Sequence, residues 1–171
     1  MNNYINSFIK KFDYYFEQKE ISHIIYVHDQ DDHERLDQVL FLEKDDGHVI
    51  GLYIRGMNPL ISVNRIDDLD DFNLFASYER LVESKENIKL RIENIRLFFS
   101  SKYNELLGFY LSNKDESSSL FVLFLQDEMD VKKNESKSDA SKILKSRYST
   151  EGLFTYEKNS QGDWEEIEME Y

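Results

Sequence analysis

The sequence predicts a single α+β domain in which an antiparallel β-sheet packs against an N-terminal helix and one or two central helices. Three observations carry this prediction. A helical amphipathic pattern opens the chain, short alternating apolar segments follow it, and no linker or internal repeat divides the 171 residues. The chain is 40% hydrophobic and 14% aromatic, a composition that favours a packed core over disorder. We therefore expect residues 1–171 to form one domain.

Residues 3–18 are predicted to form the N-terminal helix. Their apolar side chains recur at steps of three and four residues, which gathers them on one wide face of a helix. That face consists of Tyr4, Ile5, Phe8, Ile9, Phe12, Tyr15 and Phe16. Because large apolar side chains are usually buried, we expect this stripe to be part of the core rather than a ligand site.

Four strands are expected next, at residues 21–28, 36–44, 48–55 and 60–63. The second and third are separated by Asp45-Asp46-Gly47, and an Asp-Gly pair between two apolar segments is a strong hairpin signal. Glycine supplies the positive φ that such a tight turn requires. Asn58-Pro59 is interpreted as a further turn.

The central part of the chain is predicted to be helical. In residues 70–83, two aspartates stand where a helix begins and the apolar residues share one face. Residues 88–105 are ambiguous, because they fit a helical face but also alternate like two strands that are one residue out of phase. The length of this segment favours a helix.

The remaining elements alternate between strands and polar segments. Strands at 106–111 and 120–125 are expected to pair through a polar loop, and residues 127–140 are expected to form a mobile polar loop because they have almost no apolar content. Asp139 is a candidate N-cap for a short helix that extends to Tyr148. Two last strands are predicted at 153–158 and 164–171.

The net charge is −13, from 34 acidic and 21 basic residues. The acids concentrate in residues 29–46, 67–71 and 163–170, whereas basic residues predominate in 85–102 and 132–147. Such a charge attracts basic partners and repels nucleic acid backbones. If these regions occupy separate faces, the protein has an acidic working surface.

The acidic clusters supply the candidate partner-binding residues. In the last predicted strand, glutamates alternate with apolar residues, so that one face carries carboxylates about 6.6 Å apart. An acidic edge strand also resists aggregation, and that simpler interpretation remains open. Tyr53 and Phe72 are candidate aromatic anchors beside the acids. The predicted binding residues are Asp29, Asp31, Asp32, Glu34, Asp67, Asp68, Asp70, Asp71, Trp164, Glu166, Glu168, Glu170 and Tyr171.

No segment predicts a catalytic site, and we expect neither enzymatic activity nor a cofactor. The chain has no cysteine, and its glycines form no phosphate-binding loop. The segment from His28 to Glu34 is rich in metal-ligating residue types, but its spacing matches no coordination pattern and is ordinary for a turn. No nucleophile signature accompanies the four histidines, which are His23, His28, His33 and His48.

Composition also bears on location. The first residues lack the uninterrupted apolar stretch of a secretory signal, and the longest apolar run, 120–125, is far shorter than the roughly 20 residues that cross a bilayer. We expect a cytoplasmic protein that contacts neither membrane nor nucleic acid directly.

In composition the chain resembles the acidic immunity proteins of bacterial toxin–immunity systems, although it shares no motif with them. The leading hypothesis is a non-enzymatic inhibitor that covers the substrate-binding face of a basic toxin, such as a nuclease. One alternative is a bacterial or phage structural or regulatory module whose charge serves solubility. The other is a metal-dependent hydrolase that uses the segment from His28 to Glu34.

Overall fold

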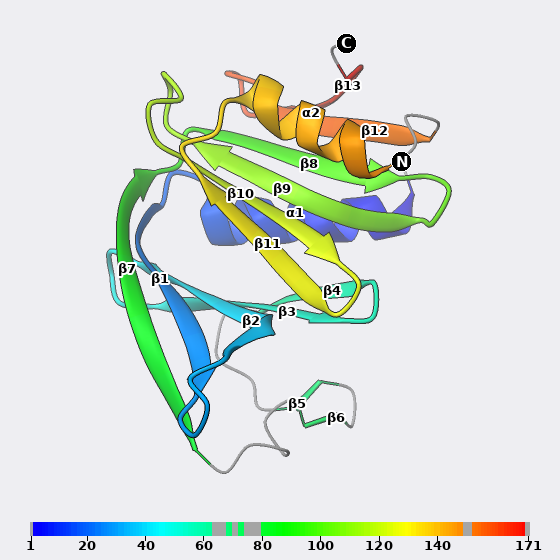
Figure 1. The fold of residues 1–171 in the computed structure, drawn as a ribbon. Helices are drawn as coiled ribbons and strands as arrows, with labels where there is room; N and C mark the ends of the chain where they lie inside the picture. The colour runs from blue at the N-terminus through cyan, green and yellow to red at the C-terminus, as the bar shows by residue number, and fades with distance from the viewer. Residues whose placement is uncertain (1, 63–67, 70–71, 74–79, 149–151, 170–171) are drawn as a thin grey trace.

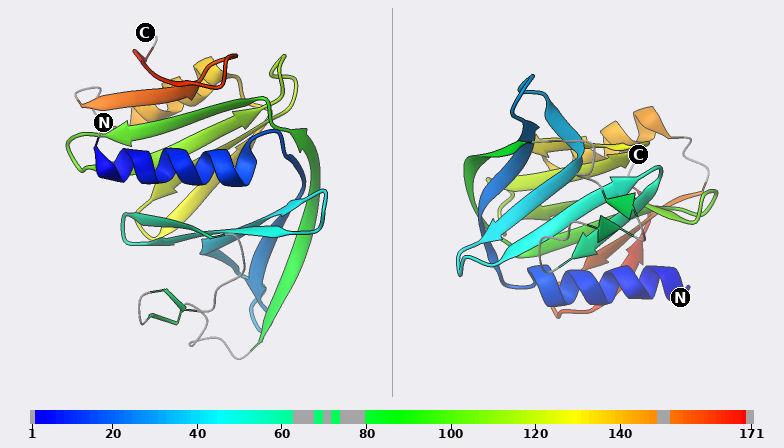
Figure 2. Two further views of the ribbon diagram at one scale, coloured as in Figure 1. Left: turned by 180° about the vertical axis from the view of Figure 1, so that it is seen from behind. Right: turned by 90° about the horizontal axis from the view of Figure 1, so that it is seen from below.

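The computed structural model describes residues 2–62, 68–69, 72–73, 80–148 and 152–169. It is a single α+β domain with two antiparallel sheets and two helices, as Figure 1 shows. The two sheets are stacked, one helix lies between them along an open side, and the other helix covers the outer face of the upper sheet (Figures 1 and 2).

The first sheet has five strands in the order β4-β3-β2-β1-β7. Its first four strands form a meander of sequential hairpins, and β7 then pairs with the free edge of β1. The turn at Gly47, which has a φ of +82°, joins β2 to β3 as predicted. The strands are β1 (Glu20–Asp29), β2 (Arg35–Lys44), β3 (Val49–Arg55), β4 (Asn58–Ser62) and β7 (Leu81–Arg91).

The second sheet has six strands in the order β11-β10-β9-β8-β12-β13. The predicted pairing of the two apolar segments around residues 113–118 is confirmed, because β9 and β10 form an antiparallel pair. The strands are β8 (Asn94–Ser100), β9 (Glu105–Ser112), β10 (Ser119–Leu125), β11 (Glu128–Lys133), β12 (Leu153–Lys158) and β13 (Trp164–Ile167). A separate two-stranded hairpin comprises β5 (Asp68–Leu69) and β6 (Phe72–Asn73).

The helix α1 (Asn3–Phe16) has the apolar face that the sequence predicts. Asn2 caps it, because the Asn2 side chain accepts a hydrogen bond from the backbone N–H of Tyr4. Phe12 and Phe16 are fully buried and pack against Phe109 of β9. The helix thereby fills the space between the sheets and belongs to the core cluster that both sheets share.

The helix α2 (Lys137–Arg147) covers the outer face of the six-stranded sheet. Ala140 and Leu144 are its buried apolar residues, and they join an apolar cluster with side chains of β8, β9 and β10. Its N-cap is Ser136, whose hydroxyl accepts from the backbone N–H of Asp139. The prediction that Asp139 caps this helix was therefore wrong, although a helix forms here as expected.

Three further predictions are corrected. Residues 88–105 form the end of β7, then β8 and a turn, rather than a helix. Residues 127–140 contain β11 and the start of α2, rather than one continuous loop. Asn58 and Pro59 are paired residues of β4, and the turn precedes them.

The predicted helix at 70–83 lies mostly outside the described residues. Phe72 and Asn73 form β6, and the segment from Leu81 belongs to β7, so neither of these parts is helical. In the described part of the chain, neither helix has the length and apolarity that crossing a lipid bilayer requires.

Candidate binding surfaces

The first acidic cluster occupies the turn between β1 and β2. The backbone N–H of Asp31 donates to Asp29 Oδ1 and that of Glu34 to Asp32 Oδ1, both at 2.9 Å. These two carboxylates therefore shape the turn, which is the ordinary use of aspartate in such loops. Asp31 and Glu34 are exposed, and their carboxylates have no partner among the described residues. We call Asp29, Asp31, Asp32 and Glu34 the turn surface.

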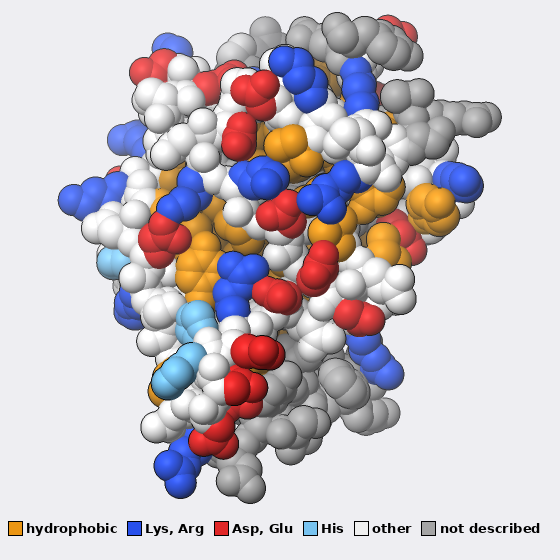
Figure 3. All heavy atoms as spheres, viewed as in Figure 1, with side chains coloured by type: hydrophobic (Ala, Val, Ile, Leu, Met, Phe, Trp, Pro, Cys, Tyr) orange, Lys and Arg blue, Asp and Glu red, His pale blue; other side chains and the backbone are white. Residues whose placement is uncertain are grey.

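The second acidic cluster is only partly described. Asp67, Asp70 and Asp71 lie outside the described residues. Asp68 pairs with Asn73 in the β5–β6 hairpin, which lies at the same end of the molecule as the β1–β2 turn (Figure 1). In Figure 3, acidic side chains gather at this lower end, below the mixed charges that cover the upper sheet.

The third cluster follows the β12–β13 hairpin. Glu166 and Glu168 are exposed, whereas Ile167 and Met169 are partly buried, which is the alternation that the sequence predicts. The strand is shorter than expected, because β13 ends at Ile167. The last two predicted binding residues, Glu170 and Tyr171, lie outside the described residues.

A cavity adjoins this third cluster. It has a volume of about 390 Å³, and its walls come from the C-terminal half of α2, from β12 and from the β13 segment. The apolar lining residues are Leu153, Phe154, Ile167 and Met169, and the charged ones are Lys145, Glu166 and Glu168. We call this cavity the terminal cavity.

Glu166 is oriented at the terminal cavity by a tyrosine. The hydroxyl of Tyr156 donates to Glu166 Oε2 at 3.0 Å. Burial raises the pKa of Tyr156, and the adjacent negative charge of Glu166 raises it further, so the phenol remains a donor. The Glu168 side chain has no hydrogen-bond or ion-pair partner among the described residues.

Two of the predicted aromatic anchors, Trp164 and Tyr53, have structural roles. Trp164 Nε1 donates to Asp13 Oδ1 at 2.9 Å, and the ring packs against the core, so Trp164 ties β13 to α1. Tyr53 is fully buried and meets Phe41 edge to face. The side chain of Phe72 is outside the description. Tyr53 is therefore unsuited to anchor a partner, whereas a binding role for the partly buried Trp164 stays a prediction.

The acidic clusters do not share one face. The turn surface and the terminal cavity lie at opposite ends of the molecule, because β1 and β2 run away from the six-stranded sheet that carries β13 (Figure 1). The order of strands decides this separation, and neither spacing nor composition indicates it.

Neighbouring acids neutralise some of the residues in the basic segments. Lys85 pairs with Glu43 at 2.8 Å, and Arg147 pairs with Asp130 at 3.3 Å. Figure 3 accordingly shows Lys and Arg interspersed with Asp and Glu over the upper sheet and α2. On the face that Figure 3 shows, acidic and basic side chains are therefore interspersed rather than separated.

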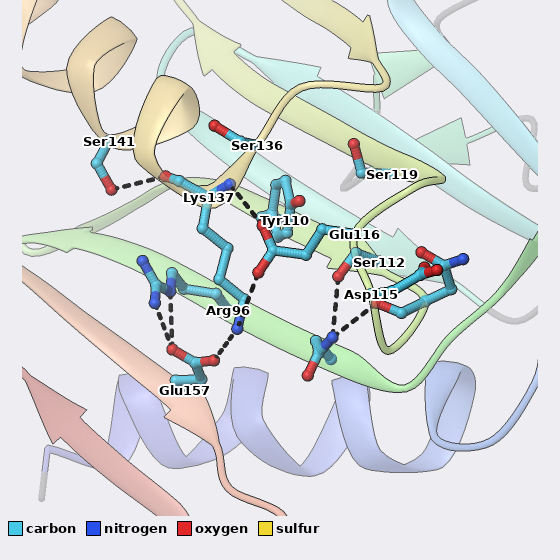
Figure 4. Close-up of polar contacts among 12 residues, drawn as sticks. Arg96, Tyr110, Ser112, Asp115, Glu116, Ser119, Ser136, Lys137, Ser141 and Glu157 are labelled. Atoms are coloured by element: carbon cyan, nitrogen blue, oxygen red, sulfur yellow. Dashed lines mark hydrogen bonds and ion pairs between the residues drawn. The ribbon is translucent and has the colours of Figure 1, made fainter.

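The most extensive ion network among the described residues, which sequence reasoning missed, joins α2 to the sheet beneath it (Figure 4). Glu157 of β12 lies between two cations: Arg96 Nε donates to it at 3.0 Å, and Lys137 Nζ contacts its other oxygen. Lys137 also approaches Glu116 at 3.7 Å. These side chains are only 13% to 31% exposed. The alternation of β8 and β12 indicates where Arg96 and Glu157 point, but only their register reveals the pair.

Two histidines contact serine hydroxyls. His23 Nδ1 lies 3.2 Å from Ser22 Oγ and 2.9 Å from Glu43 Oε2, so the hydroxyl and the carboxylate face the same ring nitrogen. His28 Nε2 lies 2.9 Å from the hydroxyl of Ser84, a contact between β1 and β7 that the sequence does not reveal. Within the described ranges, no three His, Asp or Glu side chains are grouped so that they could hold a metal ion.

Comparisons with known proteins add no relative: no family model, no curated protein and no solved structure matches this chain. Any proposal for function therefore depends on the surfaces themselves.

Proposed function

We propose that this chain is a non-enzymatic binding protein that neutralises a basic protein partner. The terminal cavity is the observation that carries the proposal. It combines an apolar lining with the carboxylates of Glu166 and Glu168 at the surface of a chain whose net charge is −13. A hollow with these features offers both area to bury and charge to pair.

The side chains that fit this combination are lysine and arginine. Each has an aliphatic stem that can lie on Leu153, Phe154 and Ile167, and a cationic head that can reach a carboxylate. Arginine is favoured, because its planar guanidinium can engage a carboxylate through two hydrogen bonds. The turn surface, at the other end, would then contribute mainly to long-range attraction of the partner.

A partner with this chemistry is a protein that itself binds phosphates. We infer that the chain is an inhibitor, of the immunity-protein type, that covers the substrate-binding face of a cationic toxin such as a nuclease. Such a protein would act in the cytoplasm and would not bind nucleic acid directly, because its net charge opposes a polyanion.

The proposal is tested by co-purification with the product of the neighbouring gene at low and high salt. Two double variants bring the same change in net charge at opposite ends: Glu166→Lys with Glu168→Lys, and Asp31→Lys with Glu34→Lys. The first pair should lower affinity at least tenfold at every salt concentration. The second pair should chiefly slow association, and its effect should fade as salt rises.

The outcome separates this proposal from its alternatives. If both double variants bind as the unmodified protein does, with the same salt dependence, the proposal is wrong, and a module whose charge serves solubility is favoured. A stoichiometric metal in protein purified without a histidine tag would instead favour the metal-dependent hydrolase. Circular dichroism of each variant establishes that any loss of binding does not reflect unfolding.

A further inference from the structure

A second hollow lies where the end of α1 meets the β2–β3 hairpin. Its volume is about 350 Å³, within the range typical of small-molecule sites. Two tyrosines of α1 line one side and the hairpin lines the other. The lining residues are Tyr14, Tyr15, Lys19, Lys44, Asp46, His48 and Ile50. We call it the hairpin pocket.

One wall of the hairpin pocket is an exposed aromatic ring. Tyr14 is 75% exposed, although tyrosine rings usually bury most of their surface. Its ring meets that of Tyr15 edge to face, with centroids 5.4 Å apart. The Tyr15 contact leaves most of the Tyr14 ring free, and a planar ligand could stack there.

The charge around this ring is opposite to that of the whole chain. Lys19 and Lys44 line the pocket together with a single carboxylate, that of Asp46. Asp46 is already engaged, because the backbone N–H of His48 donates to it at 2.9 Å and His48 Nδ1 lies 3.1 Å from it. The pocket is therefore a local positive region on a protein with a charge of −13.

Lys44 in particular has a single anionic partner among the described residues, Asp46, and the contact is long. Its side chain is only 16% exposed, and its ammonium lies 3.9 Å from Asp46 Oδ2, beyond hydrogen-bond distance. No other carboxylate among the described residues approaches this ammonium. Asp46 neutralises Lys44 only partly, because this ion pair is long and the other oxygen of Asp46 contacts His48. A largely covered cation with such a weak counter-charge is a favourable place for an anion to bind.

From these observations we propose that the hairpin pocket binds a small planar anion, meaning an aromatic ring that carries a phosphate or a carboxylate. The ring stacks on Tyr14, and the anionic group pairs with Lys44 and Lys19. The site is independent of the acidic surfaces at the two ends of the molecule, so it stands whether or not a basic partner binds there.

Isothermal titration calorimetry at low ionic strength tests this site, with AMP, adenosine and inorganic phosphate as probes. AMP should bind with a stoichiometry of one and more tightly than either of its parts. Tyr14→Ala should weaken AMP binding about tenfold, because stacking on an aromatic ring is removed. Lys44→Gln should weaken it similarly, and the exposed Lys19→Gln provides a second charge variant if Lys44→Gln fails to fold.

Matched controls come from residues that do not line the hairpin pocket. Tyr103 is the comparable exposed tyrosine, at 52%, and Lys114 is an exposed lysine in the β9–β10 loop. Tyr103→Ala and Lys114→Gln should leave AMP binding unchanged. The proposal is overturned if AMP does not bind at millimolar concentration, or if these controls weaken binding as much as the pocket variants do. Equal affinity for phosphate and AMP would refute the stacking role of Tyr14.

Discussion

Replacing Glu157 with alanine is expected to destabilise the fold by about 2–3 kcal/mol. The substitution removes the carboxylate that lies between Arg96 and Lys137, and it leaves two cations facing one another at a poorly hydrated site. Removing one partner of a fully buried ion pair costs about 3–5 kcal/mol, whereas a surface pair is worth about 0–1 kcal/mol. Because Glu157 is 19% exposed, the expected value lies between these limits.

The single tryptophan provides the assay, since Trp164 bridges β13 and α1 and should report their separation. Urea unfolding followed by its fluorescence should show the loss, and the thermal midpoint should fall by about 5–10 °C. The control is Lys142→Ala, which removes the ion pair between Lys142 and Asp139. Because the Lys142 side chain is 74% exposed, this change should lower the free energy of unfolding by at most about 0.5 kcal/mol. If Glu157→Ala is no more destabilising than this control, the reasoning is refuted.

Three further predictions follow from particular contacts. Burial raises the pKa of Glu157, but hydrogen bonds from Lys137 and Arg96 outweigh this effect and hold the pKa below its usual value. The stabilisation from Glu157 is therefore present above about pH 4.5 and is lost as the pH falls through the folded-state pKa. Urea titrations at several pH values should accordingly show a weaker acid dependence of stability for Glu157→Gln than for the unmodified protein. Gly108→Ala should lower the free energy of unfolding by about 1–3 kcal/mol in the urea assay, because the added Cβ would lie 2.5 Å from the carbonyl oxygen of Val122. An unchanged urea midpoint would contradict this prediction. Trp164→Phe should lower the free energy of unfolding by about 1 kcal/mol, because the hydrogen bond to Asp13 is lost. Unfolding followed by circular dichroism measures this loss. If Trp164→Phe costs as much in an Asp13→Ala background, the hydrogen bond is not the cause.

The elements with clear local signals were predicted well. The helix at the N-terminus and the hairpin at Gly47 formed close to the expected residues, because amphipathic spacing and turn chemistry are local properties. The segment 88–105 was mistaken for a helix, although its alternation was visible. Its apolar residues change phase at Ile92, and in the structure this is the point where the chain leaves β7 in one sheet and enters β8 in the other.

The edge strand β11 was missed for a different reason. It needs few apolar residues, since of its side chains only Met129 is buried, so its composition is that of a loop. The terminal cavity could not be predicted from local sequence either. Local sequence identified Glu166 and Glu168, but the terminal cavity also requires Leu153 and Phe154, which the pairing of β12 with β13 brings close. Such long-range pairing is not encoded in any single segment.

The position of β7 beside β1 has a consequence for synthesis on the ribosome. Asp29 pairs with Leu81 and Ile21 with Leu90, so β1 cannot complete its pairing until residues 81–91 have emerged. The β1–β4 meander can assemble earlier, but one rim of the growing sheet then exposes unpaired backbone groups. During that interval the nascent chain is most vulnerable to association with other chains, and a pause in translation between the emergence of β4 and that of residues 81–91 would prolong it.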